Sequence, residues 1–147
     1  MPVIPELAHL AEHPELALSI TTGTEHFSVG QTALTVHGSG AVEIDNRRAG
    51  SHQRYTGQLS PSETAAFGSE MASLGVVALS SDRTTYEMGE MTVTIEVRSG
   101  DRVIVHTELP ADERFSNDRV ARLVGAYEGL VGRFTDGALP YGRPVPG

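Results

Sequence analysis

The sequence predicts an α+β domain in which an antiparallel sheet of about six strands is covered on one face by two helices. Six segments alternate apolar and polar residues with the period of a strand, and two longer segments space apolar residues with the period of a helix. Connections between them are short. The predicted order is strand, strand, strand, strand, helix, strand, strand, helix. We assign a lead-in with a short helix to residues 1–14, the domain to residues 15–134, and a tail rich in glycine and proline to residues 135–147.

Composition excludes several classes of protein. A chain of 147 residues with 39% hydrophobic and 20% charged residues suits one folded domain, and no apolar run is long enough to span a membrane. The absence of cysteine excludes disulfides, thiolate metal sites and a cysteine nucleophile. A net charge of −8 disfavours nucleic acid and anionic membranes as partners. The N-terminus lacks the basic and apolar regions of a secretory signal, so we expect a cytoplasmic protein.

The first part of the chain predicts a helix, a strand and a loop. Residues 5–13 have the pattern of about two turns of amphipathic helix, which Pro14 ends. Alternation over residues 16–21 predicts the first strand. Residues 22–30 read as a loop with an exposed tip, whose two bulky side chains are His26 and Phe27.

The second and third strands can be paired from the sequence. Their apolar residues share one face only if an odd number of residues connects them, and Gly38-Ser39-Gly40 is such a connection. This loop predicts the pairs Val36 with Val42 and Leu34 with Ile44. Because a strand follows it, we interpret the loop as a hairpin turn and not as a phosphate-binding loop.

A fourth strand and the first helix follow. Tyr55, Gly57 and Leu59 indicate a strand after a polar turn at residues 47–51. Serine at the N-cap, proline at N1 and glutamate at N3 then form a capping box that begins a helix. The helix has an expected core stripe and a C-terminal glycine: Phe67, Met71, Leu74 and Gly75. Residues 80–89 are interpreted as a loop.

The strongest strand pattern lies in a late hairpin over residues 91–109. A three-residue loop at residues 99–101 predicts that Val97 pairs with Val103 and Ile95 with Val105. The other face of this hairpin is then exposed to solvent, and it carries Glu96, Ile104, His106 and Glu108.

The last helix has a continuous apolar stripe: Val120, Leu123, Val124, Tyr127, Leu130, Val131 and Phe134. Its opposite side gathers three glycines flanked by three arginines: Gly125, Gly129, Gly132, Arg119, Arg122 and Arg133. Each interior glycine costs about 0.8 to 1 kcal/mol relative to alanine. In one interpretation a second chain packs closely on this strip while the arginines meet its acidic groups. In the other, glycine-rich composition has drifted onto an unconstrained surface.

Three groups of residues resemble catalytic or metal sites. His9-Leu10-Ala11-Glu12-His13 matches the zinc motif H-x-x-E-H, but the segment is short and has no third ligand, so we expect a solvated helix face and no metal. On the solvent face of the sheet, His106 lies near Glu108, with Thr94 expected opposite and Glu96 diagonal, an arrangement that suits a general base. A nucleophile and a pocket are missing there, so a structural role is favoured. Glu43 and Asp45 form a carboxylate pair that we interpret as solubilising charge.

Four segments carry a further pattern: residues 20–30, the hairpin 34–42, the run Gly57-Gln58-Leu59-Ser60-Pro61-Ser62-Glu63, and the late hairpin 92–109 with its closing helix. Together these segments resemble emfourin, a small bacterial inhibitor of thermolysin-like metalloproteases. The resemblance covers about residues 16–134, and the segment 23–27 departs from the glycine pair usual in the emfourin loop. The resemblance to emfourin implies a cytoplasmic or periplasmic binding protein that uses loops or a sheet edge and needs no cofactor.

We therefore expect a non-enzymatic protein-binding module, in its most specific form a metalloprotease inhibitor. The partner is another protein or a second copy, and the expected contact residues are His26, Phe27, Arg122, Gly125 and Gly129. An immunity-like or antitoxin-like protein also fits the small size and the acidity, because negative charge steers association with a basic partner. The rival class is a small enzyme that uses His106 and Glu108.

Overall fold

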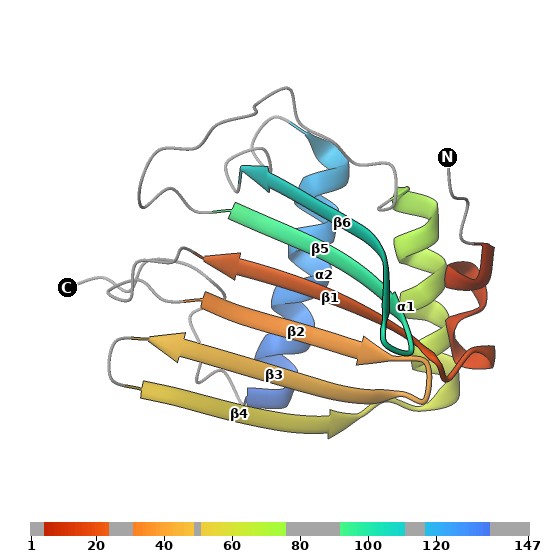
Figure 1. The fold of residues 1–147 in the computed structure, drawn as a ribbon, viewed down its shortest axis with the longest axis horizontal. Coiled ribbons are helices and arrows are strands. Elements are labelled where there is room, and N and C mark those ends of the chain that lie inside the picture. Colours follow the sequence, from red (N-terminus) through yellow and green to blue (C-terminus); the bar gives the residue numbers. More distant parts are fainter. Residues whose placement is uncertain (1–4, 24–30, 49–50, 76–91, 111–116, 136–147) are drawn as a thin grey trace.

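Six antiparallel strands form one sheet, in the spatial order β4-β3-β2-β1-β5-β6 (Figure 1). The computed structural model describes residues 5–23, 31–48, 51–75, 92–110 and 117–135. The elements along the chain are η1 (Pro5–Glu12), β1 (Leu16–Gly23), β2 (Gln31–His37), β3 (Ala41–Arg48), β4 (Ser51–Gln58), α1 (Pro61–Leu74), β5 (Thr92–Ser99), β6 (Arg102–Pro110) and α2 (Asp118–Thr135). The predicted α+β class and the predicted order of strands and helices are confirmed.

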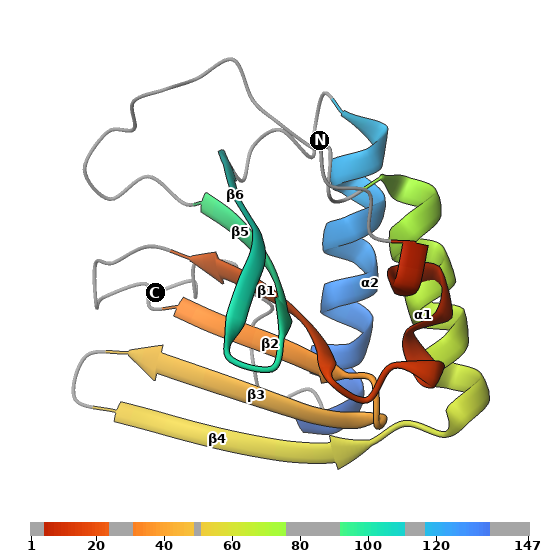
Figure 2. The same cartoon turned by 45° about the vertical axis from the view of Figure 1, so that its right-hand side comes forward.

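Both helices lie on the same face of the sheet (Figure 2). Helix α2 crosses behind the strands, and the 3₁₀ segment η1 packs beside α1 on the side away from α2 (Figures 1 and 2). No described helix lies over the other face. Inward and outward positions alternate along β2 over its whole length.

The hairpin of β2 and β3 has the predicted register. Val36 pairs with Val42 and Leu34 with Ile44, and all four side chains are buried. Gly40 closes the turn in a left-handed conformation, with φ of 92°, and its N–H donates to the carbonyl of His37. The predicted polar turn at residues 47–51 is shorter than expected, because β3 continues to Arg48 and β4 begins at Ser51.

Helix α1 begins and ends where the sequence indicates. The Ser60 hydroxyl accepts a hydrogen bond from the Glu63 N–H, and the Glu63 carboxylate accepts one from the Ser60 N–H, which completes the capping box. Gly75 adopts the left-handed conformation at the C-terminus, with φ of 67°. The predicted stripe of Phe67, Met71 and Leu74 is buried.

The predicted register of the hairpin of β5 and β6 is wrong. Val97 pairs with Val105, and Val103 instead lies opposite Arg98, because a β-bulge interrupts the ladder between Val97 and Arg98. Val103 is consequently 50% exposed. Ile104, expected on the solvent face, is partly buried against the core.

The N-terminal lead-in is part of the domain. The segment expected to be an amphipathic helix over residues 5–13 is a 3₁₀ helix with a kink at His9. It places Leu10 at 0% exposure within the core. Hydrogen bonds from the His13 N–H to the Leu10 carbonyl, and from the Leu16 N–H to the His13 carbonyl, join it to β1.

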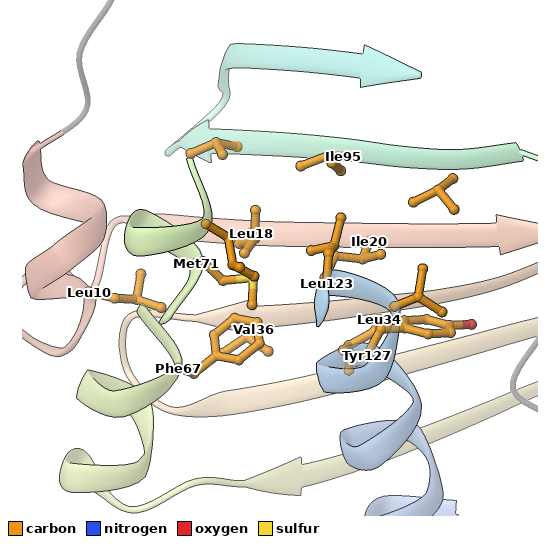
Figure 3. Close-up of a cluster of buried hydrophobic side chains, with 14 of the residues drawn as sticks. Leu10, Leu18, Ile20, Leu34, Val36, Phe67, Met71, Ile95, Leu123 and Tyr127 are labelled. Atoms are coloured by element: carbon orange, nitrogen blue, oxygen red, sulfur yellow. The ribbon is translucent and has the colours of Figure 1, made fainter. Parts of the chain in front are cut away.

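The core fills the space between the sheet and the helices (Figure 3). Buried side chains of β1, β2 and β5 face Met71 of α1 and Leu123 of α2 (Figure 3). Tyr127 of α2 lies near Leu34 in the same cluster. The predicted stripe of α2 faces this core, and Leu130 and Phe134 are partly buried at its margin. The helix extends one residue beyond the predicted domain limit, since Thr135 is buried and its hydroxyl donates to the Val131 carbonyl.

An ion pair between the two helices makes stability depend on pH. Arg133 contacts Glu63 at 2.5 Å, and this bond, with the capping bond from Ser60, lowers the pKa of Glu63 from 4.5 to about 2. A carboxyl whose folded pKa is lowered stabilises the fold above its unfolded pKa, and the stabilisation is lost as pH falls through the folded value. We expect the melting temperature of the wild-type chain to fall as the pH is lowered from 4.5 to 2. The melting temperature of Arg133→Gln should fall less over the same range. Identical melting curves against pH for the two chains would contradict this role.

Candidate functional site

The uncovered face of the sheet carries a continuous row of polar side chains. In each strand the row contains one residue, and neighbours along it are Cα partners: Thr56, Glu43, Thr35, Ser19, Glu96 and His106. Ser19 and Thr35 share a hydrogen bond of 2.9 Å at the centre. The row therefore has a hydroxyl centre with one carboxylate on each side.

His106 has a different neighbourhood from the one predicted. The bulge places Glu96 directly opposite His106, at 3.2 Å from its ring nitrogen, and moves Thr94 opposite Glu108. Glu96 also contacts Arg98. Partial burial opposes ionisation of Glu96, but the hydrogen bonds from Arg98 and His106 keep its pKa below the ordinary value.

This geometry does not suit nucleophilic catalysis. A serine nucleophile needs an imidazole beside it and a carboxylate behind the imidazole. Here the order along the row is Ser19, Glu96, His106, so the carboxylate lies between the hydroxyl and the imidazole. Two strand spacings, about 10 Å, separate the backbones of Ser19 and His106. The His106 side chain is 56% exposed.

On the other half of this face, Glu43 and Asp45 take part in cross-strand ion pairs. Glu43 lies 2.9 Å from His37, and Asp45 lies 2.6 Å from His52. Arg54 approaches Asp45 at 3.4 Å and Glu43 at 4.0 Å. The two carboxylates thus have basic neighbours on this surface, which refines their interpretation as solubilising charge.

The outer face of helix α2 carries two exposed glycines. Gly125 and Gly129 are exposed, and a Cβ built at either position meets no atom within 4 Å. Arg122, one turn away, is 66% exposed and contacts Asp118 of its own helix at 3.4 Å. The structure therefore places Gly125, Gly129 and Arg122 together on one solvent-facing surface, which we call the α2 outer face.

The other two arginines of the predicted strip are used within the chain. Arg119 donates to the carbonyls of Leu74 and Gly75, at 2.6 and 2.9 Å, and so caps the C-terminus of α1. Arg133 binds Glu63. In the interpretation in which a second chain packs on the glycine strip, Arg119 and Arg133 therefore already bind groups of their own chain.

A buried polar network was not predicted. The Tyr127 hydroxyl accepts from Thr22 at 2.8 Å and donates to the Thr32 carbonyl at 3.1 Å, while the Thr32 hydroxyl donates to Asn46 at 2.9 Å. Burial raises the pKa of Tyr127 to about 12, against the opposing effect of the Thr22 hydrogen bond. In the sequence, the network is indicated by polar residues at inward positions of β1, β2 and β3, namely Thr22, Thr32 and Asn46.

The remaining candidates have these outcomes. His26 and Phe27 lie outside the described residues. In the H-x-x-E-H segment, His9 contacts Glu12 at 3.2 Å and His13 contacts Glu15 at 3.0 Å. Within the described ranges, no cluster of three or more histidine, aspartate or glutamate side chains is arranged to hold a metal ion.

No protein-family model matches this chain, and no curated protein matches it. None of the helices in the described part of the chain combines the length and the apolar character that a membrane crossing requires.

Proposed function

We propose that this chain is a protein-binding module without catalytic activity, and that the α2 outer face is its contact surface. The observation that carries the proposal is the open space around Gly125 and Gly129. Neither glycine is required by backbone strain or by a close neighbour within the described chain. Each nevertheless costs helix stability of about 0.8 to 1 kcal/mol relative to alanine.

A surface without side chains allows another backbone to approach closely. Arg122 beside the two glycines offers a guanidinium to a carboxylate of the partner. The net charge of −8 favours encounter with a partner whose overall charge is positive. This property fits an immunity-like or antitoxin-like role as well as an inhibitor, and we take the cytoplasm as the expected compartment.

The rival proposal, a small enzyme that uses His106 and Glu108, has less geometric support. Glu96 occupies the position between His106 and the nearest hydroxyls of the row, and the imidazole is largely exposed on a sheet that no described helix covers. A general base requires a reacting group held within hydrogen-bond reach. The hydrogen bond that the described structure gives the His106 ring is with the carboxylate of Glu96, which is not a reacting group.

The resemblance to emfourin makes a thermolysin-like metalloprotease the first partner to test, with His26 and Phe27 as further proposed contacts. In the experiment, the wild-type chain is immobilised and exposed to purified thermolysin. In a second run it is exposed to an extract of the cells that naturally express this chain. Gly125→Gln/Gly129→Gln fills the α2 outer face, and Ala66→Gln adds the same side chain to an exposed position of α1. We expect at least a tenfold loss of bound partner only for the glycine variant. Equal binding by all three chains would contradict the proposal.

A side chain added at the glycines should weaken association, but it should raise the free energy of unfolding of the monomer. Gly125→Ala removes backbone freedom from the unfolded chain and adds a methyl group to open space. We expect the free energy of unfolding of the monomer to rise by about 0.8 to 1 kcal/mol, measured by urea titration. Destabilisation would show that the α2 outer face is already packed within the monomer.

A further inference from the structure

The histidines of this chain lie beside carboxylates. Each of the five histidines that the structure describes has a ring nitrogen within 3.2 Å of a carboxylate oxygen: His9, His13, His37, His52 and His106. Two of these pairs share strand β3, because Glu43 contacts His37 of β2 and Asp45 contacts His52 of β4. These two imidazoles therefore belong to one group of charges on the uncovered face.

Six ionisable side chains make up this group, which we call the β2–β4 charge cluster. They occupy outward positions of three neighbouring strands: His37, Glu43, Asp45, Arg47, His52 and Arg54. The adjacent strand β1 adds no charge, since its outward side chains are Ala17, Ser19 and Thr21. Glu15, just before β1, lies 3.0 Å from His13. At the described outward positions of β1 to β4, two imidazoles thus face two carboxylates and two guanidinium groups.

The guanidinium groups already compensate the carboxylates of the cluster. Arg54 lies 3.4 Å from Asp45 and 4.0 Å from Glu43. Arg47 is exposed and is the Cα partner of His52. While both imidazoles are neutral, the positive and negative charges of the cluster are equal in number. A proton taken up by either imidazole is then a surplus positive charge, because the cluster holds no further carboxylate to offset it.

Mild acid changes the charge of the imidazoles before that of the other groups. An imidazole ordinarily gains its proton between about pH 8 and 5, whereas carboxyl groups titrate at lower pH and guanidinium groups stay charged. The side chains of His37 and His52 are 34% and 47% exposed, so both rings exchange protons with solvent. The cluster therefore gains up to two positive charges over this interval.

We propose that the β2–β4 charge cluster is a proton-operated surface, neutral above the imidazole range and cationic below it. The positive charge is present in mild acid and is lost as the pH rises. The whole chain stays acidic until the pH falls to its isoelectric point near 5.1, so a cationic patch forms on an anionic molecule. The cluster lies on the sheet face opposite to α2, and the inference does not depend on the function proposed for the α2 outer face.

Retention of the whole chain on a sulfonated cation-exchange resin tests this inference. The resin is run at low salt, where exposed charges are least screened, at about pH 6 and at about pH 8. Both values lie above the isoelectric point, so the net charge of the chain opposes retention and a local cationic patch favours it. We expect the wild type to be retained at the lower pH and to elute with the void volume at the higher pH.

Two double variants locate the patch. His37→Gln/His52→Gln removes both imidazoles of the cluster and should elute with the void volume at both pH values. His9→Gln/His106→Gln removes the same number of imidazoles elsewhere, from η1 and from β6, which lies four strand spacings, about 19 Å, from β3. The two variants change the net charge of the chain equally, yet the second should be retained like the wild type.

A third variant should gain retention, so the test does not depend on a loss that misfolding could mimic. Glu43→Gln/Asp45→Asn leaves Arg47 and Arg54 without the carboxylates of the cluster, and this chain should be retained at both pH values. Elution of the wild type with the void volume at about pH 6, equal retention of the wild type and His37→Gln/His52→Gln, or elution of the carboxylate variant with the void volume at about pH 8 would each overturn the inference.

Discussion

Replacing Gly38 by alanine should destabilise the fold by about 3 kcal/mol. A Cβ at this position would lie 2.0 Å from the carbonyl oxygen of His13 and 2.7 Å from that of Leu10. Both obstacles are backbone atoms, so no side-chain rotation relieves the clash. The Gly38 N–H also donates to the Leu16 carbonyl at 2.8 Å, which holds the hairpin turn against the start of β1.

Thermal denaturation measures this effect, and a decrease of about 6 to 12 °C in melting temperature is expected for a domain of this size. Gly125→Ala is the matched control, because the same substitution at an open position should raise the melting temperature. A Gly38→Ala chain as stable as the wild type would mean that η1 does not pack on the hairpin turn.

Removing the hydroxyl of Tyr127 should cost about 2 to 3 kcal/mol. In Tyr127→Phe the Thr22 hydroxyl loses its acceptor and the Thr32 carbonyl loses a donor, in a position closed to water. A buried polar group left without its partner costs about 1 to 3 kcal/mol. The loss is measured as a change in the urea midpoint with unchanged slope.

A double-mutant cycle isolates this interaction. Thr22→Val removes the donor while keeping the shape of the side chain, so the double variant Tyr127→Phe/Thr22→Val should lose less than the sum of the single variants. Strict additivity of the two losses would show that the hydroxyls do not interact.

Local patterns explain why most of the fold could be predicted. The Gly38–Gly40 loop determines the register of β2 and β3 because each residue added to a hairpin loop moves the side chains to the other face. The capping box at Ser60 and the apolar stripe of α2 act within a few residues. The register of β5 and β6 could not be predicted in this way, because the bulge adds a residue inside a strand, where loop length carries no information.

The candidate surfaces depend on contacts between residues that are far apart in the sequence. Such contacts could not be predicted from the sequence pattern. Arg119 and Arg133 have the exposure pattern of a solvent face, yet Arg119 binds the end of α1 and Arg133 binds its first turn. Periodicity places a residue on a helix face but does not identify the element that it meets. Gly125 and Gly129 do lie on the exposed side of α2, and predicting that position requires only the geometry of one helix.

Comparing a glycine variant with a histidine variant in one binding measurement tests the central claim most directly. The immobilised wild-type chain, Gly125→Gln/Gly129→Gln and His106→Ala are offered the same cell extract, and the protein retained by the wild type is quantified on each. We predict that His106→Ala retains it fully and that the glycine variant loses at least nine-tenths of it. Loss by His106→Ala with full retention by the glycine variant would contradict the account and would assign function to the uncovered face of the sheet.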